Sequence, residues 1–467
     1  HDKVASWGLL DKDVVLGTAL VDMYVKCGEL SKAEEVLREL PIRNVVSWSV
    51  LITGYAQMEK GHNALECFVR MESEGLSPDA IILTSVLNAC GSVIAIEKGK
   101  QIHIEILSNC LLENDIILGN ALVDMYAKCG MLQSARKVVK ELPLRDAVTW
   151  SALIAGYAEH GECHEALNCL EFMQSEGLSP DVVTYVSILK ACGNTRAIGE
   201  GVLLHEEIKS TGFLEKHILL GNAVVDMYAK CGMLARAREV FEEICDRDGV
   251  TWNAIMSGYV QHGQYFEALD CFERMQLEGL SLDAVTFISS LKACANTGSI
   301  DKGRIIHEKI VSRCLLEKEI RLGKALVDMY AKCGRFSKAQ KVIEELPLHD
   351  VVLWNSIITG YGQYGRCEEA FNCFEQMQSE GISVDLLTYL CILKACVSAN
   401  NLEKGKQIHR HIVNRGFLEK DAVLGNALVD LYAKCGVLEI AQEVLEELPV
   451  RDTVTWNTLI TGYTTHG

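Results

Sequence analysis

The chain has 467 residues, of which 49% are hydrophobic and 23% charged, and only six are proline. A single globular core rarely grows past about 250 to 300 residues, so this length favours an elongated array that adds its core one unit at a time. The formal net charge of −18 argues against non-specific binding of nucleic acid, because such binding depends on positive charge that meets phosphate.

A fixed period of 102 residues runs along the whole chain. It separates successive members of two aromatic series, Trp48, Trp150, Trp252, Trp354 and Trp456, and Tyr24, Tyr126, Tyr228, Tyr330 and Tyr432. Only a tandem array produces such spacing, so the chain is predicted to be one array of repeats.

Each period contains three predicted helix pairs, which in one block span residues 147–181, 182–217 and 218–248. In the first, apolar residues recur at helical spacing through WSALIAGYAEHG and again through EALNCLEFMQ, and Gly161 separates the two helices. Gly177 ends the second helix, and Pro180 prevents its continuation. Because such hairpins cannot bury their apolar faces alone, we predict an all-α fold, a right-handed superhelical solenoid of helix-turn-helix repeats.

One turn departs from this pattern. Glu59 stands where Gly161, Gly263 and Gly365 close the first helix, and Gly61 follows two residues later. A left-handed residue is favourable mainly for glycine, so we expect this turn to be reshaped locally.

The 19 cysteines mostly recur at equivalent positions. We expect all three recurring sites to lie on apolar helix faces, where a reduced cysteine acts as a small hydrophobe, and this implies a reducing compartment. The three sites are Cys27, Cys129, Cys231, Cys333 and Cys435; Cys90, Cys192, Cys294 and Cys396; and Cys67, Cys169, Cys271 and Cys373.

The residue pattern of the repeats resembles the pentatricopeptide repeat family more than the tetratricopeptide repeats of similar size. VTWNAIMSGYVQHGQYFEALDCFERMQLEGLSLD resembles the P motif, AVTFISSLKACANTGSIDKGRIIHEKI the L motif, and LGNALVDMYAKCGMLQSARKVVKELPLRD the S motif. Their order resembles the plant PLS subfamily, which selects sites for cytidine-to-uridine RNA editing in plastids and mitochondria. This divides residues 1–467 into a partial L unit at 1–13; S units at 14–44, 116–146, 218–248, 320–350 and 422–452; P units at 45–79, 147–181, 249–283 and 351–385; L units at 80–115, 182–217, 284–319 and 386–421; and a partial P unit at 453–467.

The resemblance implies that each repeat takes one nucleotide of single-stranded RNA, running 5′ to 3′ along the chain. A residue early in the first helix and the last residue of the repeat would contact the exposed edge of the base. The implied base-reading pairs are Thr18 with Asn44, Ser49 with Asp79, Thr84 with Asp115, Asn120 with Asp146, Ser151 with Asp181, Asn222 with Asp248, Asn253 with Asp283, Asn355 with Asp385 and Asn426 with Asp452, while Asn457 opens a unit whose partner is missing.

By this resemblance the first pair is of the adenine type, the two serine pairs of the guanine type and the asparagine–aspartate pairs of the uracil type. Five units give no base: Val186, Ile288 and Leu390 are apolar at this place, Lys324 is unusual there, and the L unit with Thr84 and Asp115 is polar but is left unassigned with the other L units. The L units are expected to act as spacers that do not recognise a base. From the first complete unit to the last, the implied RNA sequence is A G n U G n U U n n U n U, where n is a nucleotide that the resemblance does not assign. Taken singly, each aspartate would instead be an ordinary helix N-cap.

Two further sets complete the implied RNA-binding face. Val46, Val148, Val250 and Val352 resemble the family's apolar wedges between bases, although each alone would be assigned to the core. Lys26, Lys128, Lys230, Lys332 and Lys434 stand at a place that resembles the family's phosphate-contacting lysine.

No enzymatic motif is present in the sequence. His205-Glu206-Glu207 offers the start of a zinc deaminase signature, but no Pro-Cys-x-x-Cys follows it. The histidines His103, His205, His307 and His409 recur with the period and are expected to be structural. We therefore predict a chain without catalytic residues, metal or cofactor, and without the deaminase-like domain that follows the repeats in the family.

The predicted function is sequence-specific binding of single-stranded RNA, selecting an organellar site for C-to-U editing or other processing, with editing accessory proteins as further partners. The alternative is a protein-interaction scaffold that does not read bases, which the acidic charge favours. No apolar run approaches the roughly 20 uncharged residues of a membrane helix, so no membrane partner is expected. The resemblance places the protein in a mitochondrion or chloroplast, with any targeting peptide outside these residues.

Overall fold

A computed structural model describes residues 1, 14–113, 115–214, 216–316, 319–346, 349–418 and 422–466. Nearly all of the predicted partial repeat at 1–13 lies outside these residues. Over the described ranges the chain is entirely helical, without a strand, so the predicted all-α solenoid is confirmed. The chain forms two compact units, His1–Asp246 and Arg247–Gly467.

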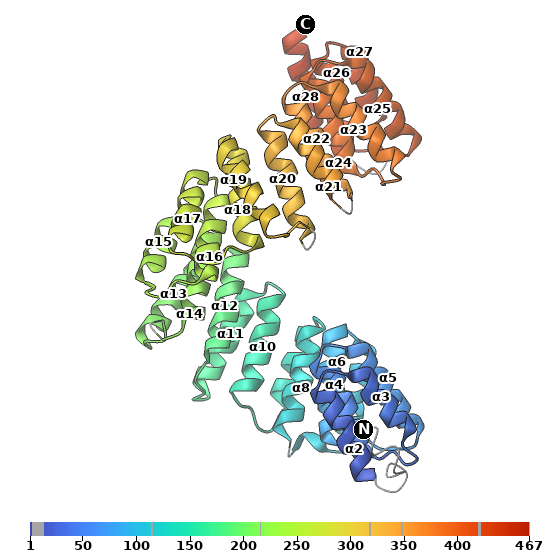
Figure 1. Ribbon diagram of the computed structural model, residues 1–467, viewed down its shortest axis with the longest axis vertical. Coiled ribbons are helices and arrows are strands. Elements are labelled where there is room, and N and C mark those ends of the chain that lie inside the picture. The colour runs from blue at the N-terminus through green and yellow to red at the C-terminus, as the bar shows by residue number, and fades with distance from the viewer. Residues whose placement is uncertain are drawn as a thin grey trace. The chain divides into compact units, whose positions relative to one another are not determined.

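The first unit contains fourteen described α-helices and one short 3-10 helix, η1 (Leu111–Glu113) (Figure 1). The α-helices are α2 (Val14–Lys26), α3 (Leu30–Glu39), α4 (Val45–Gln57), α5 (Gly61–Ser73), α6 (Ala80–Val93), α7 (Ile96–Ser108), α8 (Ile116–Lys128), α9 (Leu132–Glu141), α10 (Ala147–Glu159), α11 (Cys163–Ser175), α12 (Val182–Thr195), α13 (Ile198–Ser210), α14 (Ile218–Lys230) and α15 (Leu234–Glu243).

The second unit continues the same alternation of a first and a second helix. Its described helices are α16 (Gly249–Gln261), α17 (Tyr265–Leu277), α18 (Ala284–Thr297), α19 (Ile300–Ser312), α20 (Ile320–Lys332), α21 (Phe336–Glu345), α22 (Val351–Gln363), α23 (Cys367–Ser379), α24 (Leu386–Ser398), α25 (Leu402–Asn414), α26 (Ala422–Lys434), α27 (Leu438–Glu447) and α28 (Thr453–His466).

Within each unit the first helix of every pair packs on the first helix of the next pair. In the first unit α4 contacts α6, which contacts α8, and the row continues through α10, α12 and α14 (Figure 1). The second unit forms the same kind of row from α16 to α28. In each unit the first helices therefore form a continuous layer, and one side chain from each helix of that unit can line a shared surface.

Close approach between neighbouring first helices depends on glycine. A Cβ atom added at Gly156 in α10 would lie 2.5 Å from the Cβ of Ala127 in α8, and one at Gly360 would lie 2.6 Å from that of Ala331. Real Cβ atoms do not approach so closely, so a larger residue would force the helices apart. The 102-residue period thus maintains the close approach of neighbouring first helices as well as a set of recurring side chains.

A recurring tryptophan joins the two helices of the hairpin formed by α10 and α11. Trp150 is 8% exposed, stacks on Phe172 of α11 and donates from Nε1 to Glu176 at 2.8 Å. Arg145 at the end of the preceding repeat pairs with the same Glu176 carboxylate at 2.7 Å. Glu176, at the end of α11, therefore contacts both α10 and the preceding repeat.

The recurring histidines bond to the recurring tyrosines. His205 Nδ1 lies 3.0 Å from the Tyr228 hydroxyl, and His103 makes the same contact with Tyr126 at 2.9 Å. Burial lowers the pKa of His205, since a low dielectric disfavours the charged ring. These contacts give the histidines a structural role between a second helix and the next first helix.

The expected reshaping of the turn at Glu59 is wrong. Glu59 adopts φ 56°, close to the 74° of Gly161, and α5 begins at Gly61 just as α11 begins at the equivalent Cys163. The neighbouring helices impose the turn because the hairpin must close in the same place to keep the packing. Glu59 therefore carries the backbone strain that a glycine avoids.

Glu59→Gly should raise the free energy of unfolding by about 1 kcal/mol, because it relieves a left-handed conformation unfavourable for a residue with a Cβ. The gain is reduced by the greater flexibility of glycine in the unfolded chain. Urea unfolding followed by circular dichroism measures the change, and Gly161→Glu in the equivalent turn should lower stability by a similar amount. An unchanged or lower midpoint for Glu59→Gly would contradict this interpretation.

The cysteines differ from expectation at one of their three recurring sites. Cys90, Cys192, Cys294 and Cys396 are fully buried, as predicted for small hydrophobes. At the site that begins with Cys27, Cys129 is buried as expected, but Cys27 is exposed and Cys231, Cys333 and Cys435 are only partly buried. That site lies just past the end of a first helix, where the chain turns toward the surface, so its apolar sequence neighbours were misleading.

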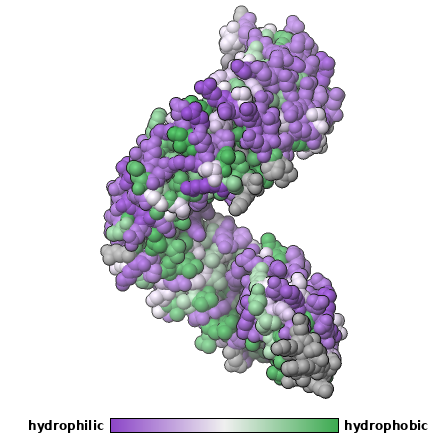
Figure 2. Space-filling model, in the orientation of Figure 1, coloured by the Kyte–Doolittle hydropathy of each residue, from purple (hydrophilic) through white to green (hydrophobic). Residues whose placement is uncertain are grey.

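The surface of the two units is mostly hydrophilic. On the face drawn in Figure 2, hydrophilic side chains cover much of each unit, and smaller apolar areas lie between them. Among the described helices, none is long and apolar enough to cross a bilayer.

Candidate nucleic-acid interface

An exposed aliphatic side chain occupies the second position of nearly every first helix. These residues are 43% to 77% exposed, although they are as apolar as the core. They are Val15, Val46, Ile81, Ile117, Val148, Val183, Leu219, Val250, Val285, Val352, Leu387, Val423 and Val454. The assignment to the core that each valine would receive alone is therefore wrong, and within each unit the layer of first helices presents a regular row of apolar side chains.

Three positions after this row, some of the paired polar residues meet across neighbouring repeats. In the first unit Asn120 Nδ2 donates to Asp146 Oδ1 at 3.1 Å. In the second unit Asn253 donates to both oxygens of Asp283 at 3.1 and 3.0 Å. Asn355 with Asp385 and Asn426 with Asp452 make the same contact at 3.3 Å.

A threonine completes three of these pairs. The Thr149 hydroxyl donates to Asn120 Oδ1 at 2.5 Å, and Thr286 and Thr455 do the same for Asn253 at 2.8 Å and Asn426 at 2.6 Å. The asparagine amide is therefore oriented by both of its neighbours. One amide hydrogen and one oxygen lone pair remain on each asparagine, which is the set that pairs with the edge of a base.

The aspartates in these pairs are also helix N-caps. Asp146 accepts a hydrogen bond from the backbone N–H of Thr149 at 2.9 Å, and Asp385 accepts one from Thr388 at 2.8 Å. Burial by itself would raise the pKa of Asp146, but the hydrogen bonds from Thr149 and Asn120 outweigh it and leave that pKa below its usual value. Capping and pairing thus coexist, and the cap fixes the carboxylate that orients the asparagine.

Other implied pairs are not joined directly. The Thr18 and Thr84 hydroxyls donate to carbonyls of their own helices, at 2.8 and 2.7 Å. Ser151 reaches Asp181 only through Thr184, whose hydroxyl lies 2.7 Å from each of them. Ser49 and Asn457 make no side-chain bond to an implied partner in the described structure. Asn222 belongs to the first unit and Asp248 to the second, so that pair stays a prediction.

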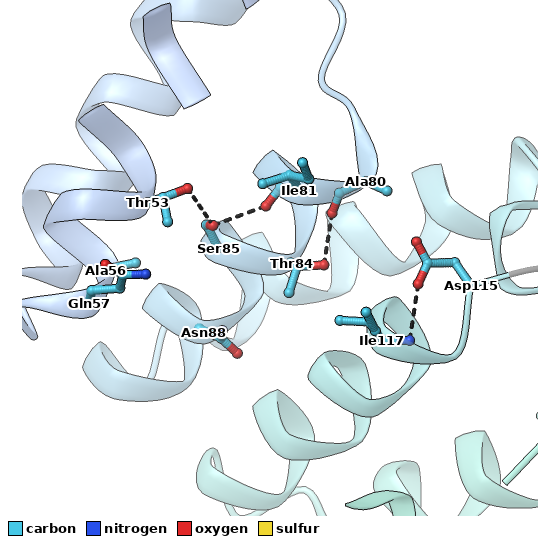
Figure 3. A pocket seen from close by; sticks show the side chains of 10 residues that line it. All are labelled: Thr53, Ala56, Gln57, Ala80, Ile81, Thr84, Ser85, Asn88, Asp115 and Ile117. Carbon is cyan, nitrogen blue, oxygen red and sulfur yellow. Dashed lines mark hydrogen bonds between the residues drawn. The ribbon is translucent and has the colours of Figure 1, made fainter. Parts of the chain in front are cut away.

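A surface pocket of about 350 Å³ contains one of the unjoined pairs. Figure 3 shows Thr84 in this pocket between the exposed side chains Ile81 and Ile117, with Asp115 beside Ile117 and Asn88 one turn beyond Thr84. Three first helices, α4, α6 and α8, line it. The pocket combines apolar walls with a hydroxyl and a carboxylate, a combination that suits a flat ring with polar edges.

The lysines assigned to phosphate are already paired. Lys128 contacts Asp124 at 2.7 Å, and Lys26, Lys230, Lys332 and Lys434 form the same i,i+4 ion pair at 2.7 to 3.0 Å. Exposed pairs of this kind contribute about 0.3 to 0.5 kcal/mol, so phosphate could displace them. Their charge is nevertheless offset, a cancellation that the Asp-x-x-x-Lys spacing in the sequence could have revealed.

One repeat carries a different pair. Lys324 stands where Asn120 and Asn426 stand in equivalent repeats, and its ammonium forms an ion pair with Asp350. Leu353 also replaces the threonine that completes the other pairs. Among the described residues, no three histidine, cysteine, aspartate or glutamate side chains gather closely enough to hold a metal ion.

Comparison with known proteins explains this repeated geometry. The PPR repeat family profile matches residues 43–92, 145–194, 247–296 and 349–398. A second profile, PPR repeat, matches residues 18–45, 120–146, 222–248, 324–351, 426–452 and 454–467. The chain belongs to the pentatricopeptide repeat family.

Its relatives include plant pentatricopeptide repeat proteins of Arabidopsis thaliana. A mitochondrial pentatricopeptide repeat-containing protein is 35% identical over 449 residues, which cover 96% of this chain and 43% of the relative. A chloroplastic one is 34% identical over 450 residues, which cover 96% of this chain and 55% of the relative. The chain thus spans about half the length of the curated relatives it matches.

Among solved structures, the chain is similar to the pentatricopeptide repeat protein PPR10 in complex with an 18-nucleotide psaJ RNA element. That structure has a TM-score of 0.65, 18% identity, and coverage of 97% of this chain and 77% of PPR10. A crystal structure of PPR10 from maize has a TM-score of 0.57 and 20% identity, and the similarity covers 96% of this chain and 76% of that one. At these identities the likeness establishes the fold.

Sequence reasoning missed part of this pentatricopeptide repeat surface. It singled out the aliphatic residue in only one repeat of each three, whereas Val15, Ile117 and Val183 show that the other repeats present it too. A usable signal existed, because an aliphatic residue follows the first residue of almost every first helix. The threonines beside the asparagines were also missed, since their role depends on a contact between repeats.

Proposed function

We propose that this chain binds single-stranded RNA along the layer of first helices, one nucleotide per repeat, in the P, L and S order given above. The observation that carries the proposal is the recurring asparagine–aspartate pair, oriented by threonine and flanked by exposed aliphatic side chains. A buried hydrogen-bonded pair would suffice for stability, but a row of exposed apolar residues beside it costs free energy unless something covers them. Stacked bases would cover them.

The base-reading residues in this proposal are the nine pairs and Asn457, with the exposed aliphatic row between successive bases. Asn120, Asn253 and Asn355 are 4% to 9% exposed, so a base would meet only the rim of each amide. Recognition by a few oriented polar atoms suits an acidic chain that cannot rely on general attraction to phosphate.

For the whole protein we propose a role in an organelle, selecting a transcript site for C-to-U editing or other RNA processing. The support is that relatives are named mitochondrial or chloroplastic and that PPR10 was solved with an RNA element. In this role the chain selects the RNA site, and another domain or protein, such as an editing accessory protein, catalyses the reaction.

Gel-shift titration tests the proposal with two 13-nucleotide RNAs, one matching A G n U G n U U n n U n U and one scrambled. We expect the matched RNA to bind at least about tenfold more tightly, because each correctly read base contributes on the order of 1 kcal/mol. Equal affinity for the two RNAs would contradict base reading. Absence of binding to either, with protein partners retained after ribonuclease treatment, would favour the scaffold function.

A further inference from the structure

The L-type repeats carry lysines on the same face as the base-reading positions. Lys190 in α12, Lys292 in α18 and Lys394 in α24 follow one another at the period of 102 residues. Each is the ninth residue of its helix, seven after the exposed aliphatic position and four after the reading position. At 3.6 residues per turn, seven residues make two turns, so the lysine lies in line with the aliphatic residue, about 10 Å further along the helix.

The first L-type repeat shows directly where this position points. Its ninth residue is Asn88 in α6, one period before Lys190, and Asn88 lines the pocket that holds Thr84 and Asp115 (Figure 3). Lys190, Lys292 and Lys394 are all exposed. The equivalent lysines therefore stand at the rim of the corresponding sites in their own repeats.

These lysines differ in charge from the other cations of the first helices. The described first helices contain ten lysines and arginines. Seven of them form ion pairs: Lys26, Lys128, Lys230, Arg321, Lys324, Lys332 and Lys434. In the described ranges, Lys190, Lys292 and Lys394 make neither an ion pair nor a side-chain hydrogen bond.

The reading position of the same repeats cannot bond to a base edge. Val186, Ile288 and Leu390 occupy it in the three repeats with lysine, whereas polar Thr84 occupies it in the repeat with Asn88. Apolar reading positions and free lysines thus occur together. A repeat of this kind offers a nucleotide a positive charge and no pattern of donors and acceptors.

We infer that Lys190, Lys292 and Lys394 bind phosphodiester groups of the RNA backbone, so that three L-type repeats contribute affinity without base preference. This inference rests on the proposed RNA binding and refines it. The S-type lysines begin paired to aspartate and must give up that pair to meet phosphate, whereas the L-type lysines lose only water. The L-type lysines are therefore the principal phosphate contacts of the chain.

The test compares Lys190→Gln, Lys292→Gln and Lys394→Gln combined in one protein with a control of equal charge change. Lys140→Gln, Lys338→Gln and Lys341→Gln form the control, because these lysines are exposed on the second helices α9 and α21. Affinity for the matched 13-nucleotide RNA is measured from about 0.05 to 0.5 M salt, with circular dichroism to verify that both variants fold.

Each phosphate contact to single-stranded RNA changes the slope of log K against log salt by about −0.7, so three contacts account for about −2. We expect the L-type variant to lose this amount of slope and to bind about a hundredfold less tightly near 0.1 M salt, while the control keeps the wild-type slope. Equal slopes for the two variants would overturn the inference even if wild-type RNA binding is strong. Failure of the wild-type protein to bind RNA would instead overturn the proposed function.

Discussion

Trp150→Ala should lower the free energy of unfolding by about 4 kcal/mol, the largest effect we expect from a single substitution. The indole is buried, and removing it leaves a cavity between α10 and α11. The change also removes the stack on Phe172 and the bond to Glu176, whose carboxylate then keeps only Arg145. In a repeat array this loss acts on one hairpin and on its contacts with the neighbouring repeats.

The matched control is Val148→Ala in the same helix. Val148 is 59% exposed, so its truncation should cost less than about 1 kcal/mol. Urea unfolding of both variants, followed by circular dichroism and extrapolated to water, gives the two free energies. Equal losses would show that the tryptophan stabilises the array through local helix preference and not through burial.

Lys324→Asn combined with Leu353→Thr should create a preference for uracil at the tenth nucleotide of the 13-nucleotide RNA. The double change rebuilds the set formed by Asn120, Thr149 and Asp146 in the equivalent repeat of the first unit. An oriented donor and acceptor then replace the ion pair that the Lys324 ammonium makes with Asp350. We expect uracil to be favoured over the other bases by about 10- to 100-fold, or roughly 1 to 3 kcal/mol.

Binding of four RNAs that differ only at the tenth nucleotide measures this preference. The single change Lys324→Asn should give a smaller preference, because Leu353 cannot donate a hydrogen bond to the new amide. The reverse exchange, Asn120→Lys with Thr149→Leu, should remove the preference at the fourth nucleotide and leave the tenth unaffected. A preference that moves at any other nucleotide would contradict the assumed register.

Local interactions explain what could be predicted from the sequence. The period of 102 residues, the two-helix repeat and the turn glycines such as Gly161 follow from helical spacing and backbone conformation, which depend on residues close together in the chain. The matched offsets of Asn120 with Asp146 also predicted that the two could act together, because equivalent residues of stacked repeats occupy equivalent places. The ion pair between Lys128 and Asp124 was equally visible as an i,i+4 spacing and was overlooked.

Contacts between repeats determined the features that the sequence did not predict. Val148 is as apolar as its buried neighbours, and only the packing of α10 leaves it 59% exposed. Glu59 was expected to distort its turn, but the helices on both sides hold it at φ 56°. The threonine at position 149 gains its role from an asparagine 29 residues earlier.

The array of hairpins and the matched spacing of its polar residues were thus determined by the sequence itself, since both follow from the recurrence of one local pattern. Exposure, charge compensation and the orientation of the asparagine amides were decided by tertiary structure, because each depends on atoms from a neighbouring repeat. The same distinction separates Lys190 from Lys230. Both are helical lysines in the sequence, but in the folded chain Lys230 is paired with Asp226, whereas Lys190 forms no ion pair with any residue that the structure describes.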